Sequence, residues 1–416
     1  MTLATFSSLA IRNYRIYVGG QAVSLTGTWM QRVAQAWLEL ELTGSGAAVG
    51  TVTGFQFVPI LLLAPWGGLF ADRFDKRRIL YVTQSIAALS AIGLALVVLT
   101  GVVALWMVYV SAIALGMAAA FDTPARQTFV QEMVGRDQLT NAVSLNSTLV
   151  NAARIVGPAI AGITIVTVGI GWCFLINGLS YISLITALLV MNSDELQPAA
   201  VSRRQKRQIF DGFAYVARTP SVRTPLILMA VAGLFTYEYQ VILPLFARFT
   251  FDGDAQTFAA MSSAMGVGAV VGGLIAASRS NRPPVSLART AIVFAILQLG
   301  VSQAPTLWMA LGSLAIVGAA SVTFIALGNA TLQLTAEPEM RGRVMGIYVL
   351  AFFGTTPLGA PLMGWVGDRF GPRLALALGG VTLLVAALYA LPRLGHDPLV
   401  DGITEPGPPP AKITGS

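Results

Sequence analysis

Residues 79–100 read ILYVTQSIAALSAIGLALVVLT, a stretch without a single charged side chain, and this kind of stretch decides the fold. As a helix rising 1.5 Å per residue it is about 33 Å long, enough to cross the roughly 30 Å hydrocarbon core of a bilayer. Lys76, Arg77 and Arg78 precede it and Gly101 follows it. The stretch therefore predicts one transmembrane helix with a charged loop in front.

Similar stretches recur along the whole chain. They occupy residues 16–40, 46–70, 79–100, 103–122, 142–167 and 171–191, and then 224–247, 255–277, 286–304, 306–329, 343–366 and 372–391. The composition agrees, because 55% of the 416 residues are hydrophobic and 11% are charged, against roughly 25% charged in soluble proteins. We predict an all-α polytopic membrane protein with twelve transmembrane helices in two six-helix halves.

The polar segments set the predicted domain limits. Residues 1–192 form the first half, 193–223 a basic linker, 224–392 the second half and 393–416 a proline-rich tail. In the linker, apolar residues recur on one side of a helix beside the arginines. This pattern predicts a helix on the membrane surface, with the apolar residues Ile209, Phe210, Phe213 and Val216.

Lysine and arginine positions predict the orientation, because short cytoplasmic loops hold an excess of them. With the N-terminus inside, 21 of the 26 positive residues fall in cytoplasmic segments, among them Arg203, Arg204, Lys206 and Arg207. We therefore expect both termini in the cytoplasm. The net charge of +7 then needs no nucleic-acid partner.

Rare residue types exclude several classes of function. One cysteine, Cys173, and one histidine, His396, leave no disulfide framework, His-based zinc site or catalytic triad within the chain. Neither Lys76 nor Lys412 follows a glycine as a P-loop lysine must. We expect no enzyme activity, no catalytic residues, no metal and no cofactor.

The two halves resemble each other in sequence. Residues 68–73 at the end of the second predicted helix correspond to residues 273–279 at the end of the eighth. Residues 157–162 in the fifth correspond to residues 359–364 in the eleventh. The offsets of 205 and 202 positions nearly agree, which indicates a duplicated six-helix unit with a site between the halves.

One loop resembles the signature G-x-L-A-D-R-x-G-R-K of the major facilitator superfamily, with Asp75 in place of glycine. It reads Gly68-Leu69-Phe70-Ala71-Asp72-Arg73-Phe74-Asp75-Lys76-Arg77. Residues 153–162 resemble the fifth-helix motif of its exporters, although Ala153 and Ala161 replace glycines. With residues 20–24, 121–125 and 341–344, the chain resembles the branch that contains macrolide efflux proteins and the enterobactin exporter. The fourth-helix arginine of drug and proton antiporters is replaced by Ala112.

This resemblance implies the major facilitator fold and a cytoplasmic gate formed by Gly68, Asp72, Arg73, Lys76, Arg77 and Asp122. Asp72 would stabilise the amides at the start of the eleventh helix, near Arg341, when the cavity opens outward. Lys76 and Arg77 would reach Asp122 or Glu132. Gly157, Pro158 and Gly162 are expected to serve close packing and a kink.

Polar residues inside the spans predict the transport path, because charges in hydrocarbon normally face a cavity or a partner. One face of the first helix carries Thr28, Arg32, Gln35 and Glu39, and one face of the fifth carries Asn151 and Arg154. The seventh carries Glu238, Tyr239 and Gln240. Two readings stay open: the arginines line the path, or they pair with Glu238 or Glu39. For Glu238 the alternatives are a proton carrier and a fixed salt bridge.

The sequence thus predicts a monomeric secondary exporter of amphipathic small molecules, drugs, macrolides or siderophore-like compounds, in a bacterial cytoplasmic membrane. Proton antiport with alternating access is the expected drive. Two arginines and one glutamate favour neutral, zwitterionic or anionic substrates over dications. The alternatives are an importer of the same fold, and a membrane sensor or assembly partner without turnover.

Overall fold

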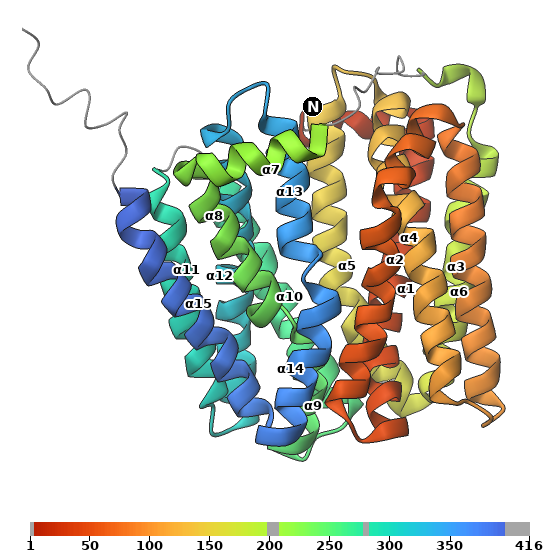
Figure 1. The fold of residues 1–416 in the computed structure, drawn as a ribbon. Helices are drawn as coiled ribbons and strands as arrows, with labels where there is room; N and C mark the ends of the chain where they lie inside the picture. The colour runs from red at the N-terminus through yellow and green to blue at the C-terminus, as the bar shows by residue number, and fades with distance from the viewer. Residues whose placement is uncertain (1–3, 198–207, 278–282, 396–416) are drawn as a thin grey trace, which may run out of the picture.

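The computed structural model describes residues 4–197, 208–277 and 283–395, and there it contains only helices and their connections (Figure 1). A short 3₁₀ helix, η1 (Ala4–Ala10), precedes the first half. The first half then contains α1 (Arg12–Thr43), α2 (Gly46–Arg73), α3 (Lys76–Leu99), α4 (Leu105–Val134), α5 (Leu139–Thr167) and α6 (Ile170–Val190). η2 (Ser193–Glu195) follows it.

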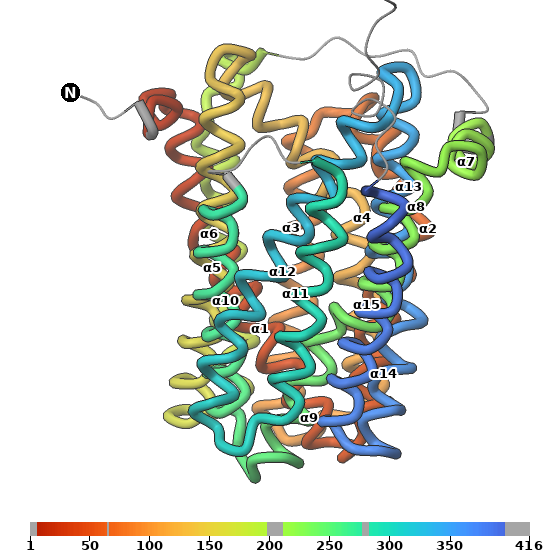
Figure 2. The backbone as a smooth tube through the Cα atoms, turned by 90° about the vertical axis from the view of Figure 1, so that its left-hand side faces the viewer, coloured from red at the N-terminus to blue at the C-terminus, as the bar shows by residue number. Residues whose placement is uncertain are grey.

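The second half follows α7 (Gln208–Arg218). It contains α8 (Pro220–Val231), the π-helical η3 (Ala232–Thr236), α9 (Tyr239–Phe251), α10 (Ala255–Ala277), α11 (Val285–Ser302), α12 (Leu307–Thr335), α13 (Arg341–Phe353), α14 (Thr356–Phe370) and α15 (Pro372–Gly395). Figures 1 and 2 show the N-terminus and α7 at one end of the bundle and α9 at the opposite end. We call these two ends the α7 end and the α9 end.

Eleven spans in the described ranges are long and apolar enough to cross a membrane. α1 is a twelfth long helix that is less apolar than these. α1 has 32 residues and packs against α6 and α5 within the bundle, but it falls short in apolar character because glutamines, Arg32 and Glu39 are spread along it. The predicted fold class is confirmed, and the weakest apolar signal belongs to the helix that carries the most polar face.

Two spans that the sequence predicts as single helices are interrupted. The seventh divides into α8, η3 and α9, with Tyr237 and Glu238 at the break, where the Tyr237 amide donates to the Ala232 carbonyl across five residues. The eleventh divides into α13 and α14 at Gly354 and Thr355. Pro357 lies in the first turn of α14, a position that needs no amide hydrogen, and proline also disfavours helix in the residue before it.

Small residues bring the two halves together toward the α9 end. α2 packs on α14, and α5 packs on α10. A Cβ on Gly50 would collide with the Ala360 carbonyl, and one on Gly364 would collide with the Gly46 carbonyl. On the other seam, a Cβ on Gly162 would lie 2.9 Å from the Ala259 methyl. Backbones that approach this closely need glycine, as membrane helix interfaces commonly do.

A carboxylate also joins the halves at the α9 end. Asp368, near the end of α14, accepts hydrogen bonds from the Ser45 hydroxyl at 2.7 Å and from the backbone amides of Gly46 at 2.5 Å and Ala47 at 2.9 Å. These amides are the unsatisfied donors at the start of α2, where the helix dipole favours negative charge. Asp368 therefore links the C-terminal end of α14 in the second half to the N-terminal end of α2 in the first.

α7 lies across the α7 end, roughly perpendicular to the bundle (Figure 1). It packs on α13, with Asp211 Oδ2 3.7 Å from Arg343 Nη1, and Phe213 is 44% exposed. The predicted linker helix therefore exists from Gln208 onward, and its contact with lipid stays a prediction. Arg203, Arg204, Lys206 and Arg207 lie outside the described residues.

Candidate functional site: a cavity between the halves

A cavity of about 640 Å³ extends from the middle of the bundle toward the α7 end. Its walls come from α1 to α6, and Gln240 at the start of α9 contributes from the other half. The polar lining residues include Gln21, Ser24, Thr28, Gln31, Arg32, Gln35, Gln56, Thr83, Gln84, Asp122, Arg126, Asn146, Asn177, Tyr181 and Gln240. Leu25, Ala87, Leu115 and Ala118 add apolar wall. Such a surface suits a molecule with both polar and apolar parts.

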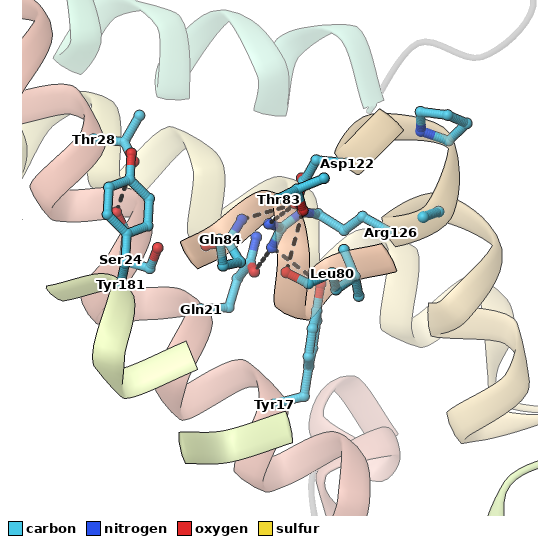
Figure 3. A network of polar contacts seen from close by, with 12 residues as sticks. Tyr17, Gln21, Ser24, Thr28, Leu80, Thr83, Gln84, Asp122, Arg126 and Tyr181 are labelled. Atoms are coloured by element: carbon cyan, nitrogen blue, oxygen red, sulfur yellow. Dashed lines mark hydrogen bonds and ion pairs between the residues drawn. The ribbon is translucent and has the colours of Figure 1, made fainter. Parts of the chain in front are cut away.

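The part of the cavity nearer the α7 end holds a closed network around Asp122 (Figure 3). Asp122 accepts from Arg126 Nε at 2.8 Å and Nη2 at 3.0 Å, and from Thr83 and Gln84 at 3.0 and 2.8 Å. Arg126 Nη1 also reaches the Tyr17 hydroxyl and Gln21 Oε1. The carboxylate and the guanidinium satisfy each other, so this wall carries little net charge.

Of the two carboxylates expected to meet Lys76 or Arg77, Asp122 is held by Arg126 in this conformation, whereas the alternative, Glu132, does pair with Lys76. Lys76 Nζ lies 2.6 Å from Glu132 Oε1, and Arg77 donates to Ser193 Oγ and the Leu189 carbonyl. Asp122 is one helical turn from Arg126 on α4, and this (i, i+4) spacing was the sequence signal for the observed pair.

The remaining gate residues have looser surroundings. Asp75 caps α3 by accepting from the Arg77 and Arg78 amides, which explains how an aspartate serves where the family signature has glycine. Within the described ranges, Asp72 and Arg73 have no ion pair and no hydrogen bond to α13. Gly68 is partly buried. Their role in a gate remains a proposal.

Both arginines inside the spans contact one tryptophan ring. The guanidinium carbon of Arg32 lies 4.4 Å and that of Arg154 lies 4.9 Å from the centroid of Trp29. Neither guanidinium forms an ion pair within 4 Å in the part of the chain that the structure describes, so the expected pairing with Glu238 or Glu39 is absent. Arg154 Nε is buried without a hydrogen-bond partner.

Glu238 lies at the break of the seventh span and is 3% exposed. Thr356, in the first turn of α14, lies near its carboxylate. Its Oε1 atom is buried without a partner and lies 3.0 Å from the place a Cβ would take on Gly359. The carboxylate thus lies where the two interrupted spans meet.

The other predicted residues divide between the cavity and the packed interior. Thr28, Gln35 and Gln240 line the cavity. Glu39 does not, and it accepts from Gln35 Nε2 at 3.0 Å while 2% exposed. Tyr239 is buried against Gln298 of α11. The interruption beside it explains why Tyr239 and Gln240 face different surroundings.

The fifth helix shows a phase error in the sequence interpretation. Val143, Asn146 and Val150 line the cavity, whereas Asn151 donates to the Ser147 carbonyl of its own helix. The packing motif lies elsewhere on the helix: a Cβ on Gly157 would lie 2.8 Å from the Thr26 carbonyl of α1. Pro158 is buried beside it.

Sequence reasoning missed Asp368, although a signal for it exists. Residues 364–373 read GWVGDRFGPR, and residues 68–77 read GLFADRFDKR. Glycine, aspartate, arginine, phenylalanine and a final arginine share the same spacing. The loop signature that resembles the superfamily at the α7 end therefore has a second copy at the α9 end.

Known proteins and structures agree with this architecture. The family model described as transmembrane secretion effector matches residues 3–395. The multidrug efflux pump Tap of Mycolicibacterium fortuitum is 29% identical, over 88% of this chain and 93% of that protein. The enterobactin exporter EntS of Citrobacter koseri is 24% identical, over 87% and 84%.

Among solved structures, the nucleoside transporter NupG superposes with a TM-score of 0.75 at 13% identity, covering 93% of this chain and 100% of NupG. This likeness concerns the fold. The matched family consists of membrane transporters and not of enzymes, and the branch predicted from the motifs is confirmed. The chain is a multi-pass membrane protein that belongs to the transmembrane secretion effector family of the major facilitator superfamily.

Proposed function

We propose that the protein is a secondary active exporter of amphipathic small molecules that works by alternating access with proton antiport. The observation that carries this proposal is the cavity, which extends from mid-bundle toward the α7 end while the halves are packed at the α9 end. Rocking of the halves would close the first end and open the second. Substrates named for relatives, drugs for Tap and enterobactin for EntS, fit the mixed lining.

We place the α7 end in the cytoplasm of a bacterium, with both termini there, on the strength of the positive residues in the loops. The conformation described here would then accept substrate from the cytoplasm. Reporter fusions after Asn192 and after Arg393 test this orientation, and both should report the cytoplasm. A periplasmic signal at either position would reverse the direction of the proposal.

Glu238 is the proposed proton carrier. Acidic residues within spans commonly mark proton relays, and its Oε1 has no partner that would hold the carboxylate in one charge state. Its position beside Thr356 and Gly359 places it against the span that must move when the halves rock. We propose a monomer in the lipid bilayer, with a small substrate and protons as its partners.

The test uses purified protein in proteoliposomes with an imposed pH gradient and a panel of drugs, macrolides and siderophore-like compounds. Export predicts accumulation on the side from which protons leave, and collapse of the gradient should abolish it. Accumulation in the opposite sense would identify an importer. Binding without any gradient-linked flux would identify a sensor or an assembly partner.

A further inference from the structure

The inner part of the cavity is rich in hydrogen-bond donors that have no acceptor. Gln31 is 3% exposed and lines the cavity, and its Nε2 has no partner, while its Oε1 accepts from Asn177. Arg32 follows it in sequence and also lines the cavity. Arg154 reaches the same Trp29 ring from α5, close enough for the two guanidiniums to repel each other.

No carboxylate among the described residues compensates these two charges. Asp122 is held by Arg126, Glu39 accepts from Gln35, and Glu238 lies beside Gly359 of α14 and forms no ion pair within the described ranges. An unpaired guanidinium inside a membrane protein is costly. Stacking on the tryptophan face offsets part of the cost, but stacking does not satisfy any N–H donor.

Stacking also leaves the donors well placed for a ligand. A guanidinium that lies flat over a ring keeps the N–H groups in its plane free at the edge, and the guanidiniums of Arg32 and Arg154 form no hydrogen bond or ion pair among the described residues. Planar edges of this kind match the two oxygens of a carboxylate or phosphate. Gln31 and Arg32 thus supply donors to the cavity, and Arg154, which is not among the lining residues, adds positive charge beside the shared Trp29 ring.

We infer that this cluster is a binding site for an oxyanion, and that the preferred substrates are amphipathic molecules carrying a carboxylate or phosphate group. The inference rests on the proposed transport function and deepens it by naming the charge of the substrate. The competing explanation is that both arginines only brace α1 against α5 through Trp29. Bracing would give no preference among ligand head groups.

A head-group series separates the two explanations. The probes are pyrenebutyric acid, its primary amide and 4-(pyren-1-yl)butylamine, with a pyrenebutyl phosphate as the fourth. They share the apolar part and differ in charge. Binding to purified protein is measured by fluorescence polarisation at neutral pH. The carboxylate should bind roughly tenfold or more tightly than the amide, as expected for hydrogen bonds to charged groups, and the ammonium should bind most weakly.

Three variants and a matched control identify the donors. Arg32→Gln and Arg154→Gln should each reduce carboxylate binding by roughly tenfold while leaving amide binding nearly unchanged. Arg32→Lys keeps the charge and should retain part of the preference. Arg393→Gln is the control, because Arg393 also stacks on an aromatic ring, Tyr389, at 3.7 Å but lies outside the cavity. It should change nothing.

Equal affinity for the amide and the carboxylate in the unaltered protein would overturn the inference, and this test needs no variant to fold. A preference that survives both Arg→Gln substitutions would overturn it as well. The phosphate probe tells whether a phosphate, including a lipid head group, is preferred to a carboxylate. Because these measurements use equilibrium binding, they stay separate from transport: gradient-driven flux of the neutral amide alone would keep the proposed function and reject the oxyanion site.

Discussion

At the scale of single residues, Glu238 lies where the two interrupted spans meet, since it precedes α9 and its carboxylate lies beside Thr356 and Gly359 of α14. If it carries the coupled proton, Glu238→Gln should bind substrate normally yet lose transport driven by a pH gradient, because the amide keeps the size but cannot titrate. Counterflow in vesicles without a gradient should remain, since it needs no net proton movement. Thr356→Val, which removes the neighbouring hydroxyl but keeps the carboxylate, is the matched control and should retain coupling. Undiminished proton-linked flux in Glu238→Gln would rule out the role.

At the scale of helices, the seam between α2 and α14 depends on glycine, since a Cβ on Gly50 would collide with the Ala360 carbonyl. Gly50→Ala should therefore destabilise this conformation by about 1–3 kcal/mol, the usual cost of overpacking. Thermal unfolding in detergent should show a lower midpoint. Gly93→Ala on α3 is the control, because no atom lies within 4 Å of the added methyl. An unchanged midpoint for Gly50→Ala would mean that the seam is looser than described.

The helices also show how much of the candidate site could be predicted from the sequence. The polar face of α1 was predictable, because Thr28, Arg32 and Gln35 have the right spacing and do line the cavity. The face of α5 was not. Serine, threonine and asparagine can bond carbonyls of their own helix, as Thr148 and Asn151 do, so a polar stripe there does not imply a cavity. Glu238 and Tyr239 required the interruption of their span, which no residue pattern located.

At the scale of the whole molecule, Asp368 holds the α9 end closed by binding the start of α2. Asp368→Asn should weaken that closure by about 0.3–1 kcal/mol, and up to about 2 if the contact is partly buried. This change shifts the equilibrium between the two conformations by several-fold to about thirtyfold. Single cysteines placed near the α9 end, in a background without Cys173, should then be labelled faster.

A substitution at the opposite end of the bundle, at Asp72, supplies the comparison. Asp72→Asn should slow transport and increase labelling near the α7 end, because its predicted partner is the start of α13 in the other conformation. The two substitutions should thus have opposite effects on labelling. Equal effects at both ends would show general loosening instead of a shift between conformations. The fold class was predictable from the length of the apolar stretches, whereas the role of Asp368 was missed because its contact joins residues 322 positions apart, which a local motif cannot place together.

The polarity of α1 has a further consequence for how the protein enters the membrane. α1 is made before the other spans described here, yet among them it is the one without enough apolar character to cross by itself. Arginine and glutamate near the centre of a helix oppose insertion by the translocation machinery. α1 therefore depends on later helices, α5 and α6 above all, to shelter its polar face. The polar residues of α1 that line the cavity for a substrate thus delay the moment in synthesis when α1 becomes stably embedded in the membrane.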